Sequence, residues 1–275
     1  MRSRFPSCPI PIETRTILSL KPITQSESIM HRMIPLVVLS LILVSAFSVR
    51  ADEDAVRAQK IVNRAVGAIG GQKALETKKV VTIKETGTYY GIGDGLPYEG
   101  EFKIQFPGNY RMEILNIFTI VVNDKMGWTS SMGETTELDE DQLKERQKLI
   151  HTSYIVSLIP IAKPGKTYRL SLTGEEKVDG ETCDGVKVES DKHRTVKLLF
   201  SRKTGLLRKS EATVRSDELD KDVVETQIFK DYRDVDGAKI AFQTEVKRDG
   251  TVFIESQATD VSFPKEADPK WFTKP

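Results

Sequence analysis

The residue types that most often carry catalysis or bind metals are sparse in this sequence. Only three histidines occur in 275 residues, and His151 and His193 are the two beyond residue 50. Neither has a His, Cys or acidic residue at metal-ligand spacing, as in the H-E-x-x-H arrangement on a helix. We therefore expect no metal and no cofactor, and we interpret His151 as a partly exposed residue of a helix.

Three further patterns fall short of known binding or catalytic motifs. No Ser stands in G-x-S-x-G, so a nucleophile elbow is missing. The glycines of residues 91–95 lack the G-x-G-x-x-G spacing and precede a strand, which indicates a hairpin loop. The acidic run 217–222 lacks the central Gly and terminal Glu of a calcium loop. We expect no enzyme, although scattered carboxylates leave a hydrolase as an open alternative.

The N-terminus has the pattern of an export signal. Residues 33–49 are an uncharged, strongly apolar run of 17 residues that follows Arg32, and small residues precede position 52. This predicts a signal peptide over residues 30–51 that is cleaved after Ala51, with an uncleaved membrane anchor as the alternative. Residues 1–29 have no periodic pattern, so we expect them to be unstructured and to result from a misassigned start site.

Composition limits the classes of partner for residues 52–275. This segment has 35 basic and 38 acidic residues, a net charge of −3, which argues against nucleic acid as a partner. Its only cysteine, Cys183, excludes an internal disulfide and a thiolate metal site, and we interpret it as a small core residue. The segment is long enough for a single domain, which we expect to be a soluble monomer.

The elements that would position a site are mostly strands, and residues 99–128 show this best. Apolar residues alternate with polar ones over 102–106 and again over 110–114, as in strands with one covered face. Pro, Gly and Asn separate the two runs and indicate a turn. Residues 117–122 are apolar on both faces, so we expect the sheet to be covered on each side there.

Two helices and further strands complete the pattern. Residues 53–69 have apolar residues at helical spacing and end in Gly70-Gly71, and a second helical pattern begins at Asp139 and stops at Pro160. We expect residues 72–75 to be a short turn and the tail 264–275 to fold over a sheet edge. Counting roughly ten or eleven strands, the fold class is α+β: a curved antiparallel sheet forming an unclosed β-barrel, with helices covering its mouth.

Apolar side chains of this sheet and of the second helix would converge if the sheet curls. They are Phe102, Ile104, Tyr110, Met112, Ile114, Ile120, Trp128, Tyr154 and Leu158. An ordinary dry core and a cavity for acyl chains use the same residue types. The pattern therefore leaves open whether the interior is filled or hollow.

The order of features resembles the outer-membrane lipoprotein-sorting proteins of the LolA/LolB-like superfamily. The similarity is carried by the leading helix that ends in Gly-Gly and by four segments: FPGNYRMEI, VVNDKMGW, TGLLRKSE and FKDYRDVDGAKIAF. It covers most of residues 52–263. It implies an unclosed barrel whose helices form a lid over a hydrophobic cavity.

The resemblance also implies a function and site residues. It implies a periplasmic carrier of lipoprotein or other lipid acyl chains, which exchanges cargo with donor and acceptor proteins in the membranes. Apolar residues that line the concave face in the family match six positions here: Phe102, Ile104, Tyr110, Met112, Ile114 and Trp128. The family's inward Arg would correspond to Arg111, but alternation places that residue opposite Tyr110. The alternative function is a periplasmic sensor or scaffold with a packed core that binds a protein partner.

Overall fold

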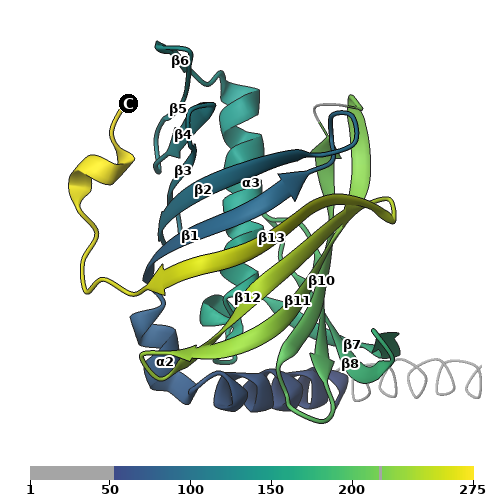
Figure 1. The fold of residues 1–275 in the computed structure, drawn as a ribbon. Coiled ribbons are helices and arrows are strands. Elements are labelled where there is room, and N and C mark those ends of the chain that lie inside the picture. Colours follow the sequence, from purple (N-terminus) through teal and green to yellow (C-terminus); the bar gives the residue numbers. More distant parts are fainter. Residues whose placement is uncertain (1–52, 217–218) are drawn as a thin grey trace, which may run out of the picture. The chain divides into compact units, whose positions relative to one another are not determined.

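The computed structural model describes residues 53–216 and 219–275, which fold as one unit (Figure 1). After a helix over residues 53–68 come α2 (Gly71–Thr77), β1 (Val80–Tyr89), β2 (Leu96–Gln105), β3 (Asn109–Ile114), β4 (Phe118–Val122), β5 (Gly127–Ser131), β6 (Glu134–Glu137) and α3 (Glu140–Val156). Then follow η1 (Ile159–Ile161), β7 (Arg169–Val178), β8 (Glu181–Glu189), β9 (Val196–Ser201), β10 (Leu207–Ser216), β11 (Lys221–Val235), β12 (Ala238–Arg248), β13 (Thr251–Ser262) and η2 (Pro269–Phe272).

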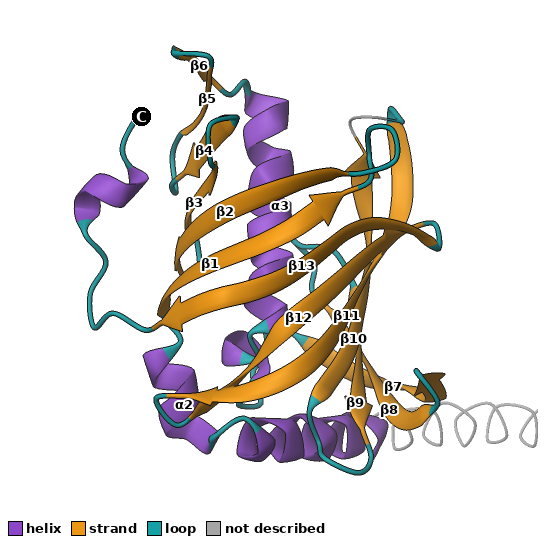
Figure 2. Ribbon diagram, in the orientation of Figure 1, coloured by secondary structure: helices purple, strands orange, loops and turns teal. Residues whose placement is uncertain are grey.

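The strands form one antiparallel sheet with a simple connectivity. Its order is β6-β5-β4-β3-β2-β1-β13-β12-β11-β10-β9-β8-β7, so two meanders are joined where β1 pairs with β13. Within the described residues the sheet does not close, because β6 and β7 are its two edges (Figure 2). The predicted α+β class and unclosed barrel are confirmed, and the sheet has thirteen strands.

Helix α3 connects the two edge strands of this sheet. It begins at Asp139, whose side chain accepts from the Gln142 backbone N–H (2.9 Å) while Gln142 Oε1 accepts from the Asp139 N–H (3.1 Å). This capping box satisfies two donors that the first turn leaves unpaired. In Figure 1 the helix runs behind β1, β2 and β13. The chain therefore crosses from one edge of the open sheet to the other through α3.

A second helical layer packs at one end of the sheet. Ala58, Val62 and Ala65 of the first helix are fully buried in a cluster with the strands β8–β10. The turn predicted over residues 72–75 is wrong, because these residues belong to α2. They include good helix formers, and Ala74 and Leu75 are buried. Gly70 and Gly71 have positive φ values, so they separate two helices instead of leading directly into a strand.

Both faces of β4 are covered, as its apolar sequence predicts. Ile120 and Val122 pack against Ile150 of α3, whereas Val121 packs against the C-terminal tail on the opposite face. The tail was expected to fold over an edge, but Phe272 of η2 instead lies with Val121 on that face. The Asn123 Nδ2 donates to the Phe272 carbonyl (3.1 Å) and holds the tail there.

The predicted signal peptide and the segment before it, residues 1–51, lie outside the described residues. Among the residues that the structure describes, no helix combines the length and apolar character needed to cross a membrane.

Candidate functional site

The face of the sheet that is turned toward α3 carries most of the predicted apolar residues. Strand pairing places Phe102 opposite Met112, and Met112 opposite Ile120, so these side chains share one face of β2, β3 and β4. We call this the inner face. The same registers add Ile104, Tyr110 and Ile114 to it. Alternation in three adjacent strands thus aligns six of the nine predicted residues.

Helix α3 covers only part of this inner face. Leu143 and Ile150 contact the apolar cluster around Ile120 and Val122. Phe102, Ile104 and Met112 nevertheless remain half-buried, although each is apolar and points inward. A tightly packed core would bury such side chains almost completely. Apolar surface is therefore available on the inner face beside α3.

Three predicted site residues lie elsewhere. Trp128 pairs with Val121 in the sheet, so it projects from the outer face, where Phe272 covers it. Leu158 follows α3 and packs with the first helix in a separate cluster. Tyr154 is on α3, and its ring lies 5.4 Å from the ring of Phe106. Neither Trp128 nor Leu158 belongs to the inner-face cluster that contacts α3.

A carboxyl group interrupts the apolar inner face. Glu85 of β1 pairs with Gly100, in the same alternating set as Ile83 and Phe102. The Tyr98 hydroxyl donates to Glu85 Oε1 (2.6 Å). Burial raises the pKa of the Glu85 carboxyl, while hydrogen bonds with Tyr98 and Ser256 oppose the rise. Burial also raises the pKa of the Tyr98 hydroxyl, and the negative charge of Glu85 adds to this.

A pocket of about 380 Å³ lies beside α3. Its lining residues are Pro107, Gly108, Asp124, Gln147, Ile150, His151, Tyr154, Tyr168 and His193. The His151 and His193 rings stack, and His151 Nε2 is 2.8 Å from the Tyr168 hydroxyl. Burial, followed by the charge of His193, lowers the pKa of His151 to about 4. These contacts attach α3 to the β7–β9 side of the sheet.

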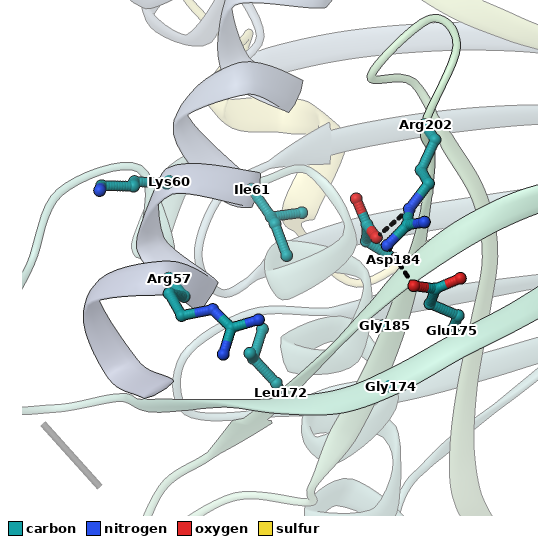
Figure 3. Close-up of a pocket in the computed structure, with 9 residues that line it drawn as sticks. All are labelled: Arg57, Lys60, Ile61, Leu172, Gly174, Glu175, Asp184, Gly185 and Arg202. Atoms are coloured by element: carbon teal, nitrogen blue, oxygen red, sulfur yellow. Dashed lines mark hydrogen bonds and ion pairs between the residues drawn. The ribbon is translucent and has the colours of Figure 1, made fainter. Parts of the chain in front are cut away.

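A second pocket, of about 370 Å³, lies between the first helix and the strands β7 and β8 (Figure 3). In it Arg202 bridges two carboxylates, with Nε 2.6 Å from Asp184 and Nη2 2.5 Å from Glu175. Arg64 of the first helix reaches Asp184 from the other side (3.0 Å). These charges neutralise one another and hold the helix on the sheet.

Within residues 53–216 and 219–275, no group of three or more His, Cys, Asp or Glu residues could hold a metal ion. Cys183 is buried against Val178, Leu199 and Ile228, as a small core residue. The half-buried apolar inner face suits a hydrocarbon chain, and Glu85 offers it a polar end.

Sequence reasoning missed two of these arrangements. A signal for Glu85 exists, because it alternates with Val81 and Ile83 and so must share their face. The pairing of His151 with His193 has no local signal, since the two residues are on different elements and 42 positions apart.

Comparison with solved structures places the fold among known ones. The chain aligns with a LolA-superfamily protein from Nitrosomonas europaea (TM-score 0.52, 13% identity, 79% of this chain and 97% of that one). A DUF1329-family protein from Desulfovibrio piger gives a TM-score of 0.52, with 13% identity over 78% and 97% of the two chains. A putative outer-membrane lipoprotein-sorting protein domain from Vibrio parahaemolyticus gives 0.51, with 9% identity over 79% and 97%.

No protein-family model and no curated protein matches this sequence. The similarity to solved structures, at 13% identity or below, therefore shows a shared LolA-like fold.

Proposed function

We propose that this protein binds the acyl chains of a lipid or lipoprotein between the inner face of β2–β4 and helix α3. The observation that carries the proposal is the half-burial of Phe102, Ile104 and Met112 in a position that faces α3. Apolar area removed from water contributes about 25 cal/mol per Å², so a long hydrocarbon chain needs no further attraction to bind there. The LolA-like fold supports this assignment.

The proposed role is that of an exported carrier in the periplasm that takes part in sorting lipoproteins to the outer membrane. Residues 30–51 would direct export and be removed after Ala51. Cargo would pass from a membrane-bound donor protein to a membrane-bound acceptor, with the carrier acting as a monomer and without enzymatic activity.

Exposed apolar residues at one end of the sheet support contacts with such partners. Ile92, Leu115, Ile117 and Met132 are exposed, and Met132 is 99% exposed. They lie in the β1–β2, β3–β4 and β5–β6 connections, which an antiparallel meander places at the same end. Together these side chains would give this end of the sheet an apolar surface, and contiguous apolar surfaces bind proteins or membranes.

Displacement of the neutral fluorescent probe N-phenyl-1-naphthylamine tests the proposal. Dodecanol added to the purified protein over residues 52–275 should displace the probe. The variant Met112→Lys should lose most of this binding, because it places a charge among the inner-face apolar groups.

Thr119→Lys is the matched control, since Thr119 pairs with Glu113 on the outer face of the same strands. It should bind like the wild type. Absence of probe binding by the folded wild-type protein, or equal binding by both lysine variants, would contradict the proposal.

A further inference from the structure

We infer that Glu85 receives the polar end of the cargo, and that the preferred cargo carries a primary ammonium group next to its hydrocarbon chain. This inference rests on the proposed binding of acyl chains to the inner face. It adds a specificity that apolar contacts alone cannot supply, because hydrophobic attraction has no direction.

The first support is the space around the carboxyl group. Two glycines lie on the same face as Glu85, Gly100 directly across from it and Gly87 two residues along β1. A Cβ atom on Gly87 would lie 2.6 Å from the Tyr98 ring, so glycine is what lets this ring lie across β1 and reach Glu85. The Tyr98 hydroxyl then holds the carboxyl group in place on the inner face.

The second support is the absence of a countercharge. Among the described residues, no Lys, Arg or His forms an ion pair with Glu85 or contributes to its pKa. Tyr98 and Ser256 use part of its hydrogen-bonding capacity, but a carboxylate has about four acceptor sites on two oxygens. Glu85 can therefore accept further hydrogen bonds from a ligand.

Another burial-shifted ionisable group, Lys78, already has a structural role. Burial lowers the pKa of Lys78 to about 8, and its Nζ donates to the Ser157 carbonyl (3.4 Å) at the C-terminal end of α3. A cation at this position complements the helix dipole. Lys78 thus lies at the negative end of the α3 dipole, whereas Glu85 has only the neutral partners Tyr98 and Ser256.

These observations select the chemistry of the ligand's polar end. An unpaired carboxylate in partly apolar surroundings gains most from a cationic donor, because charge-assisted hydrogen bonds are roughly twice as strong as neutral ones. An anionic end would be repelled. A primary ammonium has three N–H donors and is small enough to approach beside glycine.

Competition between matched amphiphiles tests the inference. Dodecylamine, dodecanol and dodecanoate share one chain length and would each displace N-phenyl-1-naphthylamine from the wild-type protein at pH 7.5. We expect dodecylamine to bind about tenfold more tightly than dodecanol, and dodecanoate to bind most weakly. Glu85→Gln should abolish the preference for the amine, measured as the ratio of the amine and alcohol affinities of the same variant.

Glu255→Gln is the control, because Glu255 accepts a hydrogen bond from Tyr90 (2.8 Å) but projects from the other face of β13. It should retain the wild-type preference. Equal binding of amine and alcohol by the wild type, or an unchanged preference in Glu85→Gln, overturns the inference while leaving acyl-chain binding intact. If the folded protein binds none of the three compounds, the proposed function itself fails.

Discussion

The imidazole rings of His151 and His193 stack face to face, with centroids 3.4 Å apart and planes inclined by 8°. One ring belongs to α3 and the other to the β8–β9 loop, so the stack connects the helix to the far side of the open sheet. Nearby, Glu145 of α3 forms an ion pair with Arg194 of the same loop. Helix α3 is thus attached to the β7–β9 side by polar contacts and to β4 by apolar ones.

The histidine stack predicts that stability decreases in mild acid. The pKa of His151 is about 4 in the folded protein and about 6.5 when unfolded, so unfolding takes up a proton between these values. Stability should therefore fall as the pH is lowered from about 6.5 to 4. Burial, followed by the charge of the nearby Lys192, lowers the pKa of His193. This shift also makes stability fall as the pH is lowered.

Urea denaturation of wild type and His151→Gln between pH 4 and 7.5 measures this effect. Between about pH 6.5 and 4, the free energy of unfolding should fall by about 1–2 kcal/mol less in the variant than in the wild type. This figure allows for solvent screening. Tyr168→Phe serves as the control. It removes the hydroxyl bonded to His151 but retains both imidazoles. Parallel pH profiles for wild type and His151→Gln would refute the assignment.

A substitution at Gly70 should strongly destabilise the protein. Gly70 has φ +111°, and a Cβ atom there would lie 2.1 Å from the Gly237 carbonyl oxygen. Gly70→Ala is expected to cost more than about 2 kcal/mol in the free energy of unfolding. Gly71→Ala is the control, because φ is also positive (+79°) but no atom lies within 4 Å of the added Cβ. Its cost should be about 1 kcal/mol, and equal costs would exclude a clash as the cause.

Trp128 should contribute to stability and not to cargo binding. Its side chain is 7% exposed and packs with Val121 and Phe272 on the outer face. Trp128→Ala is expected to lower the free energy of unfolding by about 3–5 kcal/mol, because it removes a large buried side chain. Phe272→Ala should have an effect of the same kind. If the Trp128→Ala protein folds but no longer binds dodecanol, Trp128 belongs to the binding site and the prediction is wrong.

Removal of the Glu85 charge should stabilise the protein near neutral pH. Burial raises the pKa of this carboxyl above its unfolded value, so ionisation favours the unfolded chain once the pH exceeds about 4.3. Glu85→Gln keeps an oxygen acceptor for Tyr98 and should be more stable than wild type at pH 7. The difference should shrink as the pH falls toward about 4.3 and vanish below it. A destabilised variant at pH 7 would mean that the charge supports the fold.

Local patterns in the sequence were sufficient for the fold class and for most of the elements, with α2 as an exception. Alternation in residues 102–106 and 110–114 predicted two strands and their inward residues, because side chains on a strand must alternate between faces. The apolar character of β4 on both faces predicted that both are covered. Asp139 and the helical periodicity of the residues after it predicted helix α3.

Tertiary structure decided which face each strand presents and which distant groups meet. Alternation alone could not place Trp128, because its face depends on the register between β5 and β4, and that register pairs it with Val121. His151 and His193 come together only because α3 crosses between the sheet edges. Pairing across strands likewise places Glu85 beside Tyr98. The histidine contact depends on chain closure over 42 positions, and the other two depend on strand register. No local pattern of residues encodes either one.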